Sequence, residues 1–97
     1  MQKSEILKFL TEHKAELRKN FGVTNIGLCG SYVRNENRTD SDIDLIIDME
    51  SERKDIHNYL ALKRSLENQL NARVDIGFEN AIKPAIKSHI MNEIEYV

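Results

Sequence analysis

The amino-acid sequence predicts an α/β (α+β) fold, in which helices pack on a small mixed sheet of three to four strands. Segments with apolar residues at helical spacing alternate with shorter segments rich in Val, Ile and Leu, in the order α-β-turn-β-α-β-α. The chain has 97 residues, which suits one hydrophobic core and leaves no room for a second. We therefore expect a single domain that spans residues 1–97.

Three segments have the features of helices: residues 4–20, 52–70 and 84–92. In the first, Ser4 can cap the start and Gly22 lies just past the end. The second carries apolar residues at helical spacing, namely Ile56, Tyr59, Leu60, Leu66 and Leu70. Pro84 suits the first turn of the third helix, where a backbone N–H is not needed.

Three segments have the apolar pattern of strands, residues 23–29, 42–49 and 73–78, and the tail at 95–97 could pair as a short fourth strand. Side chains two apart on a strand point to the same side, so Asp42 and Asp44 face away from the apolar residues that alternate with them. Asp75 lies between Val74 and Ile76 and should likewise face away from the core that those two residues build.

Charge and composition limit the possible partners and compartment. Fourteen basic and 16 acidic residues give a net charge of −2, so the chain has no overall positive field to attract nucleic acid. Cys29 is the only cysteine, which excludes an internal disulfide and suits a reducing compartment. The sequence shows neither a signal peptide nor an apolar stretch of membrane-spanning length. We expect a cytoplasmic protein that binds neither membrane nor nucleic acid.

Asp42, Asp44 and Asp75 are the candidate metal ligands. Two carboxylates two residues apart on a strand lie about 7 Å from each other and repel, which is costly unless divalent cations lie between them. Mg²⁺ prefers oxygen ligands and often shares its shell with substrate phosphates, and two such ions can promote an in-line displacement. Asp75, on a neighbouring strand, would complete the site.

Gly30 and Ser31 end the first strand and form the candidate phosphate-binding loop. Glycine has no Cβ, so its backbone can approach a phosphate closely, and the N–H groups of the following turn form an anion site. The Ser31 hydroxyl adds one donor, and Arg34, one turn further on, could reach a phosphate oxygen. We expect these three residues to bind the phosphates of a nucleotide.

The spacing of these residues resembles the motif spacing of the nucleotidyltransferase superfamily that includes DNA polymerase beta. Ten residues separate Gly30-Ser31 from the Asp-x-Asp pair at 42–44, and a later strand carries a third aspartate. The short chain is similar to the minimal nucleotidyltransferases of prokaryotes, the MntA-type antitoxins, and the match spans nearly all of it. Val33 and Asn35 depart from the pattern, because relatives often have a small residue and a glycine there, and this departure concerns the shape of the phosphate loop.

The resemblance implies a nucleotidyltransferase fold and a metal-dependent transfer of AMP from ATP to a hydroxyl group. Asp42, Asp44 and Asp75 would be the catalytic residues and would bind Mg²⁺, with two ions expected, and Asp75 would help to activate the acceptor hydroxyl. Gly30 and Ser31 would hold the triphosphate. In relatives of this size the acceptor is a tyrosine of a HEPN-domain ribonuclease toxin, so we expect such a partner and a hetero-oligomer with it.

Two other functions stay open at this point. The domain could neutralise its partner by binding alone, or it could transfer a nucleotide to a small molecule or RNA. The aspartate triad favours catalysis, because masking a surface does not require three carboxylates on one side. The acidic balance and the lack of room for an acceptor-binding domain argue against RNA or a small molecule.

Other reactive side chains are interpreted as structural. A calcium-binding loop beginning at Asp40 is excluded, because its sixth position is Leu45 where glycine is needed. Asp48 is too far along its strand to share a metal pair with Asp44 and should be solvated. Cys29 should be a small buried strand residue rather than a nucleophile.

Overall fold

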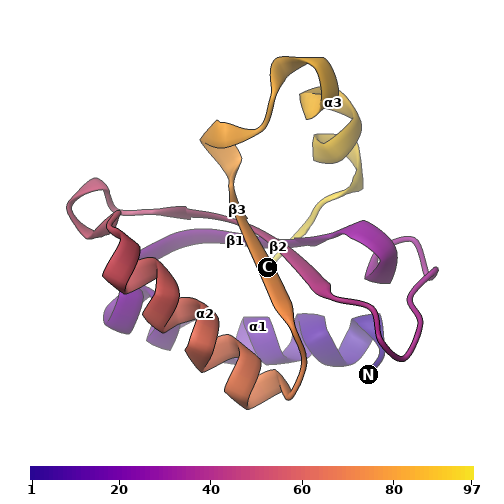
Figure 1. The fold of residues 1–97 in the computed structure, drawn as a ribbon, viewed down its shortest axis with the longest axis horizontal. Helices are drawn as coiled ribbons and strands as arrows, with labels where there is room; N and C mark the ends of the chain where they lie inside the picture. Colours follow the sequence, from indigo (N-terminus) through magenta and orange to yellow (C-terminus); the bar gives the residue numbers. More distant parts are fainter.

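Four strands form one mixed sheet in the computed structural model, which describes residues 1–97 (Figure 1). They are β1 (Val23–Cys29), β2 (Ile43–Met49), β3 (Val74–Phe78) and β4 (Glu95–Tyr96), in the spatial order β3-β2-β1-β4. β1 runs antiparallel to β2 and to β4, whereas β2 and β3 are parallel. The predicted α/β (α+β) class is confirmed, and so is the pairing of the tail as a short strand.

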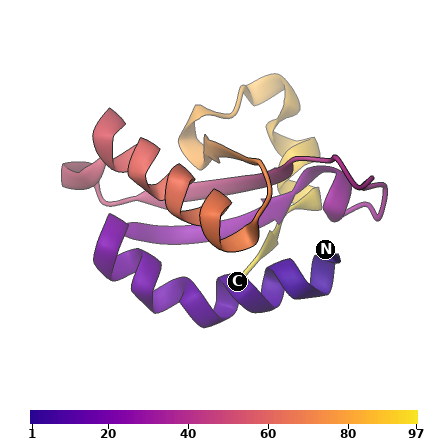
Figure 2. The same cartoon turned by 60° about the horizontal axis from the view of Figure 1, so that its bottom comes forward.

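Two helices, α1 (Lys3–Phe21) and α2 (Ile56–Leu70), cover one face of the sheet (Figure 2). The strand alternation decides what this face buries, since Ile43, Leu45 and Ile47 of β2 are at most 1% exposed. The helices add residues at helical spacing, namely Ile6, Leu10 and Leu17 from α1 and Leu62, Leu66 and Leu70 from α2. The core therefore lies on this face, which leaves the polar residues of β2 on the other.

A third helix, α3 (Pro84–Glu93), belongs to the other face of the sheet. It joins β3 to β4, which are the two outer strands, so the connection has to cross the face that α1 and α2 leave open. None of its residues is buried, and Figure 1 shows it standing clear of the rest of the molecule. Gly27 of β1 allows the following segment to lie close, because a Cβ on Gly27 would overlap Cγ2 of Ile94. The helix is thus attached mainly near its C-terminal end.

The predicted cap of the first helix is wrong. α1 begins at Lys3, and its N-cap is Gln2 rather than Ser4. The N–H of Gln2 donates to Oε1 of Glu5 at 2.9 Å, which is the interaction of a capping box. Gly22 ends the helix as predicted, in the left-handed conformation with φ +76°.

The predicted start of the second helix is also wrong. α2 begins at Ile56, because Asp55 is its N-cap and accepts a hydrogen bond from the N–H of Asn58 at 2.8 Å. Residues 51–53 form a separate 3-10 turn, and Ile56, the first residue of α2, is 62% exposed instead of facing the core. Pro84 opens α3 as predicted, and the helix ends at Glu93, one residue past the predicted end. No helix in this structure combines the length and apolar character that crossing a membrane requires.

β3 is an outer strand, and α2 covers part of its free edge. The N–H of Val74 donates to Oε2 of Glu67 at 3.0 Å, and the hydroxyl of Tyr59 donates to the carbonyl of Ile76 at 3.0 Å. Unpaired backbone groups on an edge strand invite pairing with other chains. These two hydrogen bonds therefore protect the strand that carries Asp75.

Candidate active site

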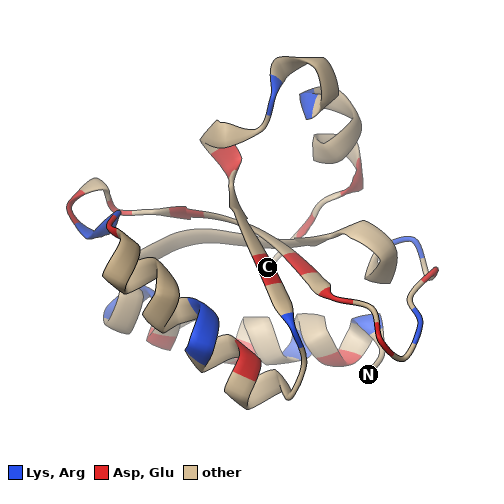
Figure 3. Ribbon diagram, in the orientation of Figure 1, with Lys and Arg blue, Asp and Glu red and all other residues tan.

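Asp44 and Asp75 lie side by side on adjacent strands. They are register partners in the parallel pairing of β2 with β3, and paired strands are about 4.8 Å apart. Both side chains point away from α1 and α2, because the residues on either side of each are buried in the core. Figure 3 shows the acidic segments of β2 and β3 next to each other. The structure therefore brings these two predicted residues together on the open face of the sheet.

Asp42 precedes β2 and contacts a basic side chain. The N–H of Ile43 donates to the carbonyl of Arg73 at 2.9 Å, so the chain here runs beside the start of β3. Oδ1 of Asp42 lies 3.4 Å from Nε of Arg73, whose side chain is 81% exposed. β2 and β3 were predicted to begin at residues 42 and 73, and each begins one residue later. No three carboxylates, imidazoles or thiols lie close enough together to hold a metal ion as they stand.

Asp44 lies in an environment that disfavours the charged form of its carboxyl group. Burial raises the pKa of its carboxyl group above the ordinary value of 3.8. The negative charges of Asp75 and then of Asp42 raise that pKa further, while the charge of Arg34 lowers it. Both other aspartates therefore repel Asp44, and a divalent cation between them would relieve that repulsion.

We expect the Asp44→Asn variant to unfold at a higher temperature than the wild-type chain at neutral pH, without divalent cations. Because folding raises the pKa of Asp44, its charge opposes folding above that pKa, and the penalty vanishes below 3.8, where both states are protonated. The gain should be only a few degrees, since the side chain is partly exposed. Circular-dichroism melts in EDTA at neutral pH and at about pH 3 would measure it.

Asp48→Asn is the matched control on the same strand, with the opposite expected sign. The N–H of Met49 and then the Lys54 side chain, whose Nζ is 3.1 Å from Oδ1, lower the pKa of Asp48. Its charge therefore stabilises the fold at neutral pH, and this contribution is lost as the pH falls through the lowered pKa. Asp48→Asn should unfold at a lower temperature at neutral pH. Shifts of the same sign in both variants would contradict this account.

Gly30 lies directly against Asp44 at the start of a short 3-10 helix, Gly30–Tyr32. Its φ of +79° is in the left-handed region, and a Cβ at this position would overlap Oδ2 of Asp44. The missing side chain therefore lets the Asp44 carboxylate lie directly against the backbone of Gly30. Ser31 follows at the beginning of the turn and is half-buried. This is the arrangement in which backbone and hydroxyl donors can approach a phosphate that shares cations with the carboxylates.

Arg34 lies one turn after Gly30, and two carboxylates hold its guanidinium. The N–H of Arg34 donates to the carbonyl of Gly30 at 3.3 Å. Its Nη1 donates to Oε1 of Glu93 at 2.8 Å, and its Nε donates to Oε2 of Glu36 at 3.5 Å. Glu93 ends α3 and lies 59 residues further along the chain, so no local sequence pattern indicates this contact. Sequence reasoning missed Glu93 for that reason.

Cys29 lies beside Asp44 on the neighbouring strand, opposite Asp75, but it is not a nucleophile. It is the register partner of Asp44 in the pairing of β1 with β2, and it is buried, as predicted. Burial, followed by the negative charges of Asp44 and Glu93, raises the pKa of this thiol to about 11. The thiol therefore stays protonated at neutral pH, and only the thiolate is reactive.

Comparison with known sequences places this geometry in one family. Residues 10–97 match a family model described as a nucleotidyltransferase domain. The chain is 42% identical to the protein adenylyltransferase MntA of Thermococcus cleftensis over 93 residues, which cover 96% of this chain and 93% of that relative.

Solved structures agree with the sequence match. A minimal nucleotidyltransferase superposes with a TM-score of 0.80 and 32% identity, covering 98% of this chain and 95% of its own. Two more distant chains share the fold. One is from a toxin–antitoxin complex with AMP-PNP, with a TM-score of 0.70 and 21% identity, covering 99% of this chain and 72% of that one. The other is from a tri-AMPylated HEPN toxin of Shewanella oneidensis in complex with MNT antitoxin, with a TM-score of 0.60 and 20% identity, covering 97% of this chain and 66% of that one. The chain therefore belongs to the nucleotidyltransferase family and is an enzyme of its minimal type.

Proposed function

We propose that this nucleotidyltransferase is a metal-dependent protein adenylyltransferase that transfers AMP from ATP to a tyrosine hydroxyl of a partner HEPN ribonuclease toxin, and so acts as its antitoxin. The observation that carries the proposal is the placement of Asp44 beside Asp75 on the open face, with the bare backbone of Gly30 against Asp44. The names of the relatives support the chemistry and the partner: an adenylyltransferase, an AMP-PNP complex and an AMPylated HEPN toxin. The expected compartment is the cytoplasm, where such a partner would act.

Asp42, Asp44 and Asp75 are the proposed metal ligands. Their oxygen donors, and the repulsion from Asp75 and Asp42 that helps to raise the pKa of Asp44, fit hard divalent cations. When bound, two Mg²⁺ ions would neutralise the phosphates and stabilise the oxygens that enter and leave the transferred phosphoryl group. Asp42 would exchange its present contact with Arg73 for this role.

The other proposed roles follow from position. Gly30 and Ser31 would hold the triphosphate against the carboxylates, and Arg34, one turn on, would contact a phosphate oxygen. Asp75 is exposed and stands on the outermost strand, so a residue of a second protein can reach it. The acceptor oxygen would bond to the α-phosphorus while the bond from that phosphorus to the bridging oxygen breaks. Pyrophosphate leaves, and the hydroxyl proton passes to Asp75.

The test is the intact mass of a purified HEPN partner encoded beside this chain, incubated with the chain, ATP and Mg²⁺. We expect the partner to gain the mass of one or more adenylyl groups, with fragment spectra that locate them on tyrosine, and we expect no gain in EDTA. Neutralisation of the partner's ribonuclease activity without any mass change would contradict the proposal and indicate a binding antitoxin. Transfer of AMP to RNA or a small molecule alone would contradict the proposal that a HEPN toxin is the acceptor.

A further inference from the structure

We propose that Glu93 is a positioning residue that holds Arg34 in the nucleotide-free chain and releases it to the triphosphate when ATP binds, so that nucleotide binding loosens α3. The inference deepens the proposed function and rests on it, because it takes Arg34 to be a triphosphate contact. It assigns a role in nucleotide binding to the last helix, which contributes no predicted site residue.

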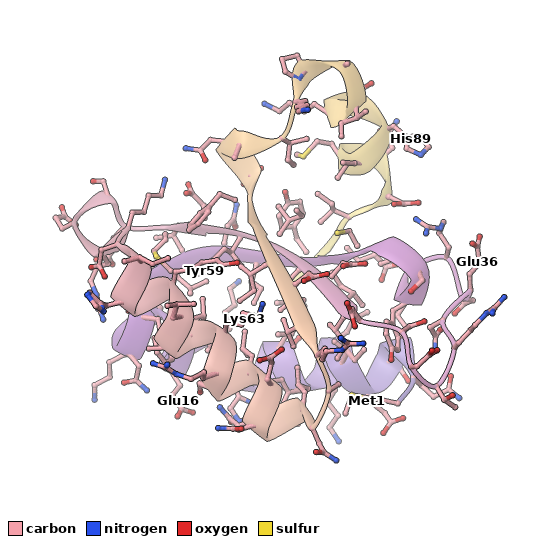
Figure 4. All side chains as sticks on the ribbon, in the orientation of Figure 1. Met1, Glu16, Glu36, Tyr59, Lys63 and His89 are labelled. Atoms are coloured by element: carbon pink, nitrogen blue, oxygen red, sulfur yellow. The ribbon has the colours of Figure 1, made fainter.

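The contact between Arg34 and Glu93 is short and sheltered. Nη1 of Arg34 lies 2.8 Å from Oε1 of Glu93, and the Glu93 side chain is only 19% exposed. The second carboxylate on the same guanidinium, Glu36, is 3.5 Å from Nε and 65% exposed. Figure 4 shows Glu36 out on the loop that follows the short 3-10 helix. Glu93 is therefore the partner that fixes Arg34.

Glu93 also adds a negative charge to a place that already has several. Its charge raises the pKa of Cys29, which is the register partner of Asp44. Glu93 therefore lies within electrostatic range of the site that contains Asp44. Within this group of acids, Arg34 is the cation that balances Glu93 and also lowers the pKa of Asp44. A triphosphate at Gly30 would compete with Glu93 for that guanidinium, and arginine binds phosphate oxygens bidentately and strongly.

Losing this ion pair should affect α3, because little else holds the helix. None of its residues is buried, and the pair to Arg34 is the only salt bridge made by a residue of α3. Figure 4 shows His89, within the helix, pointing outward. Beyond the helix, Ile94 packs on Gly27 and Glu95 pairs with Lys3 at 2.9 Å. The tail should therefore stay attached when the ion pair between Glu93 and Arg34 breaks.

The first test is the affinity for AMP-PNP with Mg²⁺, measured by calorimetry on the full chain. Glu93→Gln keeps the side-chain shape and removes the charge, and it should tighten binding about three- to tenfold. Arg34→Gln should weaken binding, and in that background the gain from Glu93→Gln should largely disappear because no guanidinium is left to release. Glu95→Gln, which removes the same charge two residues on, should change the affinity less than about twofold.

The second test is hydrogen exchange, which does not depend on any variant folding. Amides of α3 in the wild-type chain should exchange faster when AMP-PNP and Mg²⁺ are bound, and adenosine should have no such effect because it lacks phosphates. Weaker or unchanged binding by Glu93→Gln, or slower exchange of α3 on nucleotide binding, would overturn the inference and leave the proposed function standing. Failure of every form of the chain to bind AMP-PNP would overturn both.

Discussion

Replacement of both Asp42 and Asp44 by asparagine should reduce AMP transfer by at least about a thousandfold and leave the fold intact. Carboxylate charge is what attracts divalent cations, and removing one preorganised electrostatic group from an active site commonly costs about a hundred- to a thousandfold. The fold should survive because Asp44 is repelled by its acidic neighbours. Asp42 has only a long, exposed contact to Arg73.

The measurement is the rate at which the HEPN partner gains adenylyl mass, with a thermal melt of each variant. Asp48→Asn is the matched control, since it removes an aspartate charge from the same strand and open face, where Asp48 pairs with Lys54 outside the site. It should retain transfer within about twofold. A double variant that kept more than about a tenth of wild-type transfer would refute the metal-binding role of the pair.

The same double variant separates catalysis from masking. If modification neutralises the partner, the variant should bind the partner but leave its ribonuclease active. If the variant still neutralises the partner in full, then binding alone is sufficient and the aspartates serve another purpose. Affinity for the partner should be measured directly, because loss of neutralisation through loss of binding would imitate the first result.

Local sequence patterns were sufficient for most of the fold. The alternation of Ile43, Leu45 and Ile47 with Asp42 and Asp44 determines which side of β2 faces the helices, and the structure buries those three residues as predicted. The starts of two helices were predicted wrongly because a nearby residue caps each of them instead. At the start of the first helix, Gln2 replaces Ser4, and at the start of the second, Asp55 caps the helix after a separate turn.

The geometry of the site needed information that local patterns do not contain. The sequence predicts that Asp44 and Asp75 both face away from the core, but not that they are register partners, because the register of parallel strands depends on how the intervening helix packs. The partners of two arginines were missed for the same reason. Arg73 contacts Asp42 and Arg34 contacts Glu93, and both pairs bring together distant parts of the chain.

Gly30→Ala should reduce nucleotide binding and AMP transfer far more than it reduces stability. An alanine in the left-handed conformation costs about 1–2 kcal/mol, and the φ of Gly30 is +79°. In addition, the new Cβ would overlap Oδ2 of Asp44 and come 3.0 Å from its Cγ, so the carboxylate must move. Displacing a catalytic group by about 1 Å can cost about a hundredfold in rate. We therefore expect a loss of transfer of about that size, together with weaker binding of AMP-PNP.

Gly22→Ala distinguishes the effect on the site from the effect on the backbone. Gly22 has nearly the same conformation, with φ +76°, and its added Cβ would meet the flexible Arg53 side chain, 2.9 Å away at Cγ, rather than a proposed metal ligand. The two variants should therefore lose comparable stability in thermal melts, while only Gly30→Ala loses transfer and AMP-PNP affinity. If both variants lost transfer equally, backbone strain alone would explain the result. The contact between Gly30 and Asp44 would then have no specific role in the reaction, and the proposal that Gly30 holds the triphosphate would be wrong.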